Sequence, residues 1–360
     1  MNMKLLHNEL IDWYELNKRI LPWRETDDPY KIWISEIILQ QTRVAQGMEY
    51  YMRFVERFPN IQSLADAEED EVLLYWQGLG YYSRARNLHK AAKIAASSGL
   101  FNMVQNSSTL YEQLRSLPGI GDYTAGAIAS FAFDLPYPAL DGNVYRVLSR
   151  LYDCEIAFDT TQGKKHFRKL AEELLDRERP RLFNSAIMEL GALHCVPTAP
   201  DCHTCPLNTW CKALANNTVE LLPVRKPRPK LRERYLEYTI YITPERTTLI
   251  HQRKGNDIWK HLYEFPVQEI HSLEDAHSGY SLSAPHNAAS VIGAPAEVKG
   301  EKILELTHVL SHQKLHARFI IKNVPELPKI PDTVVVHLSD LDNYAFSRLT
   351  LRAIEFLAQR

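Results

Sequence analysis

The sequence predicts a mostly helical protein that ends in a smaller α+β domain. Over residues 1–220, apolar residues recur at helical spacing between breaks marked by Pro and Gly. At 221–234 the composition changes to LLPVRKPRPKLRER, which is typical of an extended, basic linker. From 236 to 242 apolar residues alternate with other residues, as in a half-buried strand.

Element by element, the same signals give a first assignment. Helical spacing covers 5–19, 30–58, 63–79, 84–97, 109–116, 122–133, 143–152, 162–178 and 180–194. In the second part we expect strands at 236–242, 248–251, 318–322 and 334–338, and a closing helix at 347–359. The stretch 268–300 is poor in pattern, so we expect it to be rich in loops.

Composition excludes some classes of protein. The 360 residues are 45% hydrophobic and 24% charged, which is ordinary for a globular chain of about two domains. No apolar run reaches the ~20 residues that span a bilayer, and Glu9, Asp12 and Glu15 interrupt the place of a signal-peptide core. We therefore expect a cytoplasmic protein that does not enter membranes. The net charge of −2 means that any nucleic-acid surface must be a local patch.

The most informative stretch is Leu117–Asn143, LPGIGDYTAGAIASFAFDLPYPALDGN. Gly119 and Gly121 suit a tight turn in which positive φ is tolerated. A glycine turn that opens a helix presents free amides to an anion such as a phosphate. Asp141 follows a Pro-rich break, outside the apolar helix.

A second carboxyl group lies in another apolar stretch, IWISEIILQQT. Glu36 is surrounded there by apolar residues near the front of a helix, and burial would raise its pKa enough to make it a proton donor near neutral pH. Cleavage of an N-glycosidic bond needs such an acid for the leaving base and a carboxylate for the sugar cation. Glu36 and Asp141 are candidates for these two roles.

Four of the five cysteines are clustered as C-x6-C-x2-C-x5-C: Cys195, Cys202, Cys205 and Cys211. In a reducing compartment such a cluster indicates a metal site more often than disulfides. The chemistry allows either a zinc ion or a [4Fe–4S] cluster.

Taken together, these stretches resemble the MutY-type adenine DNA glycosylases of the helix-hairpin-helix base-excision superfamily. The matching segments are LPWR (21–24), DPYKIWISEIILQQTRV (28–44), GLGYYSRARNLHKAA (78–92), LPGIGDYTAGAI (117–128), LDGNVYRVLSR (140–150), MELGALHC (188–195) and the cysteine cluster.

The resemblance implies a two-lobed helical domain and a domain that recognises the lesion. It implies a six-helix lobe at about 29–134, an iron–sulfur lobe of 1–28 plus 135–220, the linker 221–234, and a Nudix-like domain at 235–360 that binds 8-oxoguanine. It also implies that the four cysteines hold a [4Fe–4S] cluster. The substrate implied is duplex DNA containing adenine opposite 8-oxoguanine or guanine, bound by a monomer.

The resemblance also implies roles for single residues. Glu36 would protonate adenine and help to activate water, Asp141 would stabilise the sugar cation, Asn143 would support the acid network, and Tyr123 would lie beside Glu36. The residues implied in contacts to adenine or DNA are Trp23, Arg24, Leu39, Gln41, Thr42, Tyr81, Gly119, Gly121, Ser311 and His312, with a monovalent cation as a further ligand of the glycine hairpin.

Two alternatives and some departures from the family pattern stay open. An endonuclease III-like enzyme would carry a lysine nucleophile where this chain has Tyr123. A non-catalytic cluster protein would not need the Glu36–Asp141 pair. Leu310 replaces the usual Phe of the recognition loop, Ser185 replaces a Gln or Glu near the base, and the loop 196–201 has no basic residue.

Overall fold

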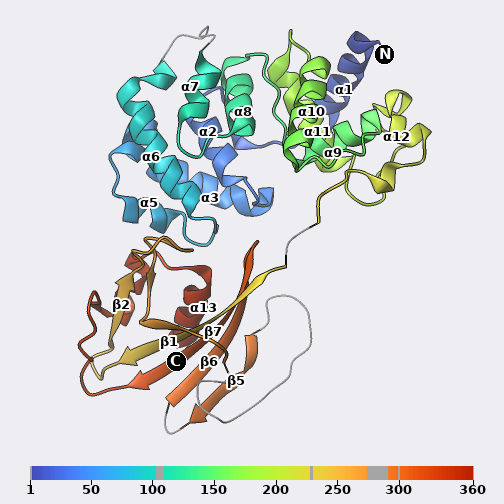
Figure 1. The fold of residues 1–360 in the computed structure, drawn as a ribbon. Coiled ribbons are helices and arrows are strands. Elements are labelled where there is room, and N and C mark those ends of the chain that lie inside the picture. The colour runs from blue at the N-terminus through green and yellow to red at the C-terminus, as the bar shows by residue number, and fades with distance from the viewer. Residues whose placement is uncertain (1, 103–108, 228–229, 274–290, 299–300, 360) are drawn as a thin grey trace. The chain divides into compact units, whose positions relative to one another are not determined.

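Helices make up the first part of the chain and a mixed sheet the second, which confirms the predicted fold class (Figure 1). The computed structural model describes residues 2–102, 109–227, 230–273, 291–298 and 301–359. The chain forms two compact units. The first unit contains residues 1–66 and 87–227, and the second contains 67–86 and 228–360. The predicted domain boundaries stay a prediction.

The first unit is built from helices. They are α1 (Met3–Asn17), α2 (Pro29–Ile38), α3 (Val44–Arg57), α4 (Ile61–Ala65), most of α6 (Ser83–Ser98), α7 (Leu110–Ser116), α8 (Asp122–Phe133), α9 (Gly142–Tyr152), α10 (Thr161–Leu174), α11 (Pro180–Leu193) and α12 (Lys212–Ala215).

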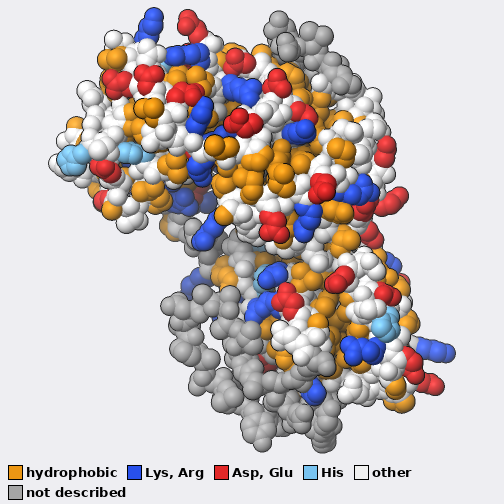
Figure 2. Space-filling model, turned by 180° about the vertical axis from the view of Figure 1, so that it is seen from behind, with side chains coloured by type: hydrophobic (Ala, Val, Ile, Leu, Met, Phe, Trp, Pro, Cys, Tyr) orange, Lys and Arg blue, Asp and Glu red, His pale blue; other side chains and the backbone are white. Residues whose placement is uncertain are grey.

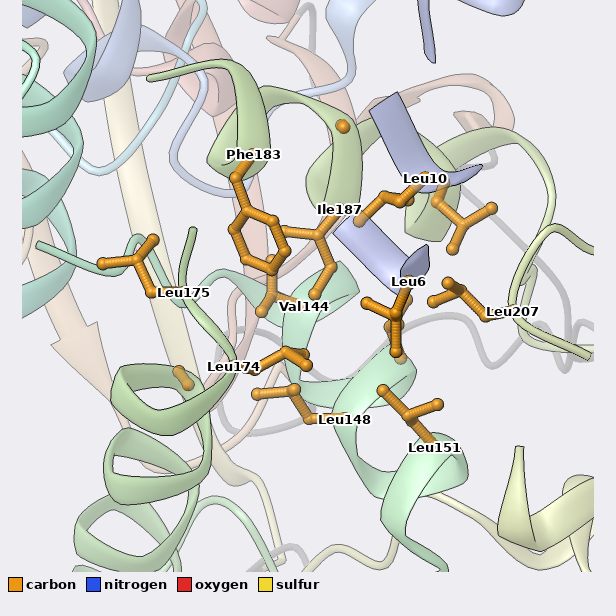
Figure 3. Packing of buried hydrophobic residues seen from close by; sticks show 14 of the residues in the cluster. Leu6, Leu10, Val144, Leu148, Leu151, Leu174, Leu175, Phe183, Ile187 and Leu207 are labelled. Carbon is orange, nitrogen blue, oxygen red and sulfur yellow. The ribbon is translucent and has the colours of Figure 1, made fainter. Parts of the chain in front are cut away.

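One core of this unit joins helices that are distant in the sequence. Figure 3 shows buried leucines, valine, isoleucine and phenylalanine of α1, α9, α10 and α11 packed together. Leu207 lies beside them and comes from residues 195–211, the segment with the four clustered cysteines, here called the cysteine segment. The contributing residues include Leu6, Leu10, Val144, Leu148, Leu151, Leu174, Phe183 and Ile187. This packing holds the start of the chain against α11.

Local sequence explains where the helices of the site begin. The Asp28 side chain accepts a hydrogen bond from the Tyr30 N–H, and Pro29 occupies the first turn of α2, where its missing N–H costs nothing. Asp141 caps α9 in the same way. The helical spacing at 30–58 belongs to two helices, because Gln41 adopts a left-handed conformation (φ 57°) between α2 and α3.

The described part of the second unit combines two sheets with the helices α5 and α13 and the start of α6. The larger sheet has the order β4-β1-β7-β6-β5, with β1 parallel to β7 and the other pairs antiparallel; the smaller has the order β3-β2-β8. The helix α13 lies beside the strands of the larger sheet (Figure 1). Its Leu349 and Ala353 join the core of this unit together with apolar side chains of the strands. The elements are α5 (Glu69–Tyr75), β1 (Arg232–Ile242), β2 (Thr247–Gln252), β3 (Tyr263–Glu264), β4 (Val267–Ile270), β5 (Val291–Val298), β6 (Glu301–Val309), β7 (Gln313–Asn323), β8 (Val334–His337) and α13 (Arg348–Ala358).

Some sequence assignments need correction. The helical run at 63–79 is two short helices, α4 and α5, separated at 66–68. The stretch 268–300 is not only loop, because β4 and β5 lie in it, while its part 274–290 falls outside the described residues. The sequence pattern does not predict the strand β6, which the structure contains at Glu301–Val309. Gly121 has φ −94°, so only Gly119 (φ 79°) uses the positive φ expected of both.

Within the described ranges, no helix combines the length and the apolar character needed to cross a lipid bilayer. On the face shown in Figure 2, basic and acidic side chains are interspersed rather than gathered by sign. This agrees with the small net charge.

Candidate active site

One cavity of about 840 Å³ in the first unit brings together most of the predicted site residues. This volume lies in the range of pockets that hold small organic ligands. Tyr81, Ser311 and His312 belong to the second unit and are not among its lining residues. The predicted residues that line it are Trp23, Arg24, Glu36, Leu39, Gln41, Thr42, Tyr123, Asp141 and Asn143.

Glu36 is an almost fully buried carboxyl group, with 6% of its surface exposed. It lies in the last turn of α2 and not near the front of that helix, because α2 ends two residues later, at Ile38. The Tyr123 hydroxyl donates a hydrogen bond to Glu36 Oε2 over 2.5 Å. Burial is the main cause that raises the pKa of Glu36 to about 7, and the negative charge of Asp141 adds to it, against the Tyr123 hydrogen bond and the Arg24 charge.

Asp141 faces the same cavity from the N-terminus of α9. Its Oδ1 accepts from the Val144 N–H over 2.8 Å, and its Oδ2 accepts from Asn143 Nδ2 over 2.8 Å. Burial raises the pKa of Asp141, while these hydrogen bonds favour its charged form. The helix N-terminus also favours a negative charge here. The two carboxyl groups therefore have different surroundings, because Asp141 accepts more hydrogen bonds that favour its charged form than Glu36 does.

A chain of hydrogen bonds leads from Asp141 along α9. Asn143 Oδ1 accepts from the buried Arg146 over 2.9 Å, and Arg146 also donates to the carbonyls of Gly191 (2.6 Å) and Cys195 (2.7 Å). Asn143 thus supports Asp141 directly, and Arg146 fixes Asn143 to the end of α11 and to the first cysteine.

Glu189 is a functional candidate that the sequence reasoning did not single out. Its side chain is fully buried in the wall of the cavity, and it accepts hydrogen bonds from Arg19 (2.6–2.9 Å) and from Arg24 Nη2 (2.8 Å). Burial opposes ionisation, but these hydrogen bonds outweigh it and lower the pKa of Glu189 to about 2. Glu189 therefore holds Arg24 in place. A glutamate inside the apolar run of α11 was the available signal.

The glycine hairpin between α7 and α8 is shaped by one close contact. A Cβ on Gly119 would lie 2.8 Å from the Asn87 Cβ, and the φ of 79° is itself costly for other residues. Gly121 gives no side-chain cap to α8, so the first amides of that helix receive no such bond. The nearby acid Asp122 pairs with Arg115 over 2.6 Å, which offsets its charge.

Comparison with known proteins identifies the family. The family described as "HhH-GPD superfamily base excision DNA repair protein" matches residues 34–177, and a NUDIX domain family matches 238–356. An adenine DNA glycosylase of Buchnera aphidicola subsp. Baizongia pistaciae is 39% identical over 277 residues, 74% of this chain and 74% of the relative. Another, of Buchnera aphidicola subsp. Schizaphis graminum, is 36% identical over 90% of this chain and 89% of its own length. The chain belongs to the MutY-type adenine DNA glycosylases.

Solved structures agree on the fold. A thermostable thymine-DNA glycosylase superimposes with a TM-score of 0.53 at 25% identity, over 59% of this chain and 97% of that one. A trapped endonuclease III–DNA covalent intermediate superimposes with a TM-score of 0.50 at 21% identity, over 60% and 97%. This member of the adenine DNA glycosylase family is a monofunctional DNA N-glycosylase of base-excision repair.

The four clustered cysteines of this family member line one small pocket of about 30 Å³. Among the described residues, no three His, Cys, Asp or Glu side chains are close enough together to hold one metal ion. Four sulfur donors around a common space have the chemistry to hold a [4Fe–4S] cluster or a zinc ion. Burial raises the pKa of Cys205 to about 12, so its thiol keeps its proton until a metal displaces it.

Arg150 organises the backbone around this pocket, and the sequence reasoning missed it. Its buried guanidinium donates to Cys195 Sγ over 3.4 Å, to two backbone carbonyls just after Cys195 and to two beyond Cys211. The carbonyls are those of Val196 (2.7 Å), Pro197 (3.0 Å), Val219 (3.0 Å) and Leu222 (3.2 Å).

The two predicted lesion contacts of the second unit lie in the β6–β7 turn. Ser311 and His312 are both exposed, and the Ser311 hydroxyl lies 3.2 Å from His312 Nδ1. The turn is closed by a hydrogen bond from the Leu310 N–H to the Gln313 carbonyl over 2.8 Å. Leu310 is partly buried and packs against the core of the unit.

Proposed function

We propose that this protein removes adenine that is mispaired with 8-oxoguanine or guanine in duplex DNA, by turning the adenine out of the helix and hydrolysing its N-glycosidic bond. The observation that carries the proposal is that Glu36, with a pKa of about 7, and Asp141 line one cavity large enough for a purine nucleoside. The adenine DNA glycosylase names of the relatives support the choice of base.

In the proposed reaction, Glu36 gives its proton to N7 of adenine. The C1′–N9 bond then breaks with both electrons going to the base, and the Asp141 carboxylate stabilises the cation left on the sugar. Water adds to C1′ and returns a proton to Glu36. Adenine and an abasic site are the products, and the Tyr123 hydroxyl keeps Glu36 oriented throughout.

The remaining predicted residues have supporting roles in this proposal. Trp23 and Arg24 line the adenine pocket, and Leu39, Gln41 and Thr42 enter the duplex around the estranged base. Tyr81 inserts into the base stack, and Ser311 and His312 contact 8-oxoguanine. The amides at Gly119 and Gly121 bind a backbone phosphate, with a monovalent cation beside them.

We further propose that Cys195, Cys202, Cys205 and Cys211 hold a [4Fe–4S] cluster. When bound, the cluster would fix the fold of the cysteine segment and could exchange an electron. Arg150 and Arg146 hold that segment against α9. We expect the protein to act on the chromosome in the cytoplasm as a monomer.

An assay with one duplex tests the function. A duplex with adenine opposite 8-oxoguanine is incubated with the protein, and half of each sample is then treated with alkali. Cleavage only after alkali supports the proposal. Cleavage without alkali would indicate an endonuclease III-like lyase, and no cleavage in either half would indicate a DNA-binding protein without glycosylase activity. The Glu36→Gln variant should bind the duplex but release no adenine.

A further inference from the structure

Residues 67–86 lie inside the stretch matched by the helix-hairpin-helix family, yet they pack with the α+β part of the chain as one unit. Side chains from both ends of this segment bond to residues around β2 and β3. The pairs are Glu69 with His261, Asp70 with Gln252 (2.9 Å) and with Tyr263 (3.1 Å), and Arg86 with the carbonyl of Lys260 (2.8 Å). The segment is therefore anchored at its start and at its end.

The middle of this segment is an unusual loop that presents Tyr81. Gly78 and Gly80 have φ values of 96° and 75°, and Tyr81 itself has a φ of 48°. Positive φ is uncommon for a residue other than glycine and persists where the surroundings enforce it. The Tyr81 side chain is nevertheless 44% exposed. Because the exposed Tyr81 ring makes few packing contacts of its own, the unusual backbone conformation of Tyr81 must be stabilised by neighbouring residues.

Part of that support comes from the loop's own neighbours. The Arg84 guanidinium lies 5.2 Å from the centre of the Trp76 ring and 5.6 Å from that of Tyr81. Trp76 Nε1 and Arg84 Nη2 both donate to the Gly80 carbonyl over 3.2 Å. These contacts fix the ring of Tyr81 on one side and the carbonyl before it on the other.

The rest of the support comes from Phe346, just before α13. The Phe346 N–H donates to Gln77 Oε1 over 2.7 Å, and the Phe346 carbonyl accepts from the Tyr82 hydroxyl over 3.1 Å. The same hydroxyl accepts from the Gly78 N–H over 3.1 Å. Phe346 and Tyr82 are only 1% and 4% exposed. The backbone N–H and carbonyl of the buried Phe346 are therefore hydrogen-bonded by Gln77 and Tyr82, the residues on either side of the loop.

We propose that Gln77 and Tyr82 are positioning residues that hold Tyr81 ready to enter the base stack, and that the α+β domain, through Phe346, takes part in opening the duplex as well as in recognising the lesion. The inference rests on the proposed function, because it assigns Tyr81 the role of an inserted wedge. A ring that is already oriented loses less freedom on insertion than a mobile one, so more of its contact energy remains for unstacking the adenine.

A double-mutant cycle on the full-length protein tests the inference. The variants are Tyr82→Phe, Tyr81→Ala and the double variant. Two readouts are taken with the adenine:8-oxoguanine duplex: the single-turnover rate of adenine release, and the fluorescence rise on binding of a 2-aminopurine placed beside the 8-oxoguanine. Loss of one hydrogen-bonding hydroxyl should lower both about three- to tenfold in Tyr82→Phe. In the Tyr81→Ala background the same change should have less than about a twofold effect.

Tyr238→Phe is the matched control. It also removes a hydroxyl from a buried tyrosine of the second unit, but there the hydroxyl donates to Glu264 and not to Phe346. It should leave both readouts unchanged. Gln77→Met should reproduce the effect of Tyr82→Phe, because it removes the acceptor of the other hydrogen bond to Phe346.

The outcomes separate the two proposals. Equal effects of Tyr82→Phe with and without the Tyr81 ring, or no effect at all, would overturn the positioning role. Failure of the unmodified protein to release adenine would overturn the proposed function alone, because the fluorescence readout needs only binding and still reports whether Tyr82 acts through Tyr81.

Discussion

Replacing Glu36 by Gln should abolish catalysis and at the same time stabilise the fold above neutral pH. A buried glutamate with a pKa raised from 4.5 to about 7 binds its proton more tightly in the folded than in the unfolded state. Folding is therefore favoured by this group below about pH 4.5, and that contribution is lost as the pH rises through 7. Glutamine is neutral throughout and carries no such loss.

The size of the effect follows from the two pKa values. Each pH unit between them corresponds to about 1.4 kcal/mol, so the ionised carboxyl group costs about 3 kcal/mol once the pH exceeds 7. In a unit of roughly 200 residues this corresponds to about 6–12 °C in Tm. The difference in Tm between Glu36→Gln and the unmodified protein should thus be near zero at pH 4 to 5. At pH 8 the variant should have the higher Tm, by this amount. The rate of adenine release by the unmodified protein should fall as the pH rises past 7.

Glu189→Gln is the control in the same cavity, because the pKa of Glu189 is shifted in the opposite direction from that of Glu36. The pKa of Glu189 is lowered to about 2, so its contribution is complete above about pH 4.5 and is lost only as the pH falls toward 2. Its variant should be destabilised by a constant amount between pH 5 and 8. Calorimetry at a series of pH values measures both variants. A Tm difference for Glu36→Gln that does not change between pH 5 and 8 would refute the assignment of Glu36 as the buried acid.

Three further perturbations address the hairpin, the cysteine segment and the lesion contact. Gly119→Ala should weaken binding to matched and mismatched duplexes alike and cost about 1–2 kcal/mol of stability, because alanine is strained at this positive φ. Gly121→Ala is its control, because Gly121 has an ordinary φ and open space around the position of a Cβ. Fluorescence anisotropy titrations with DNA compare the two variants. Arg150→Gln should yield protein with less iron and weaker visible absorbance per chain, since five hydrogen bonds to and around the cysteine segment are lost. Iron analysis and absorbance spectra measure this, and full iron content would show that the cysteine segment folds without these bonds. Ser311→Ala should lower the preference for adenine opposite 8-oxoguanine over adenine opposite guanine, measured as a ratio of single-turnover rates, and an unchanged ratio would remove Ser311 from lesion recognition.

The elements with local signals could be predicted closely from the sequence. α8 and α11 begin and end within a residue of the predicted bounds, because a glycine hairpin and a proline mark their starts. Asp141 could be predicted as a candidate site residue since it follows a Pro-rich break, and the structure places it at the start of α9, in the wall of the cavity.

Features that depend on distant partners could not be predicted. Glu189 is held by Arg19, which is 170 positions away in the sequence. The attachment of 67–86 to the second unit depends on side chains that meet Phe346, and no local pattern encodes that contact. β6 was missed although Leu304 and Leu306 alternate toward the core, because Glu301, Lys302 and Glu305 are residues of low strand propensity.

The packing of α1 has a consequence for how the protein is made. The apolar face of this helix, including Leu6 and Leu10, is covered by α9 and α11, which follow it by more than a hundred residues in the sequence. During synthesis this apolar face therefore stays exposed to solvent until α9 and α11 have left the ribosome. At the usual rate of about 5–20 residues per second this takes several seconds or more. Helper proteins that shield nascent apolar surface should accordingly raise the yield of this enzyme far more when present during translation than when added afterwards.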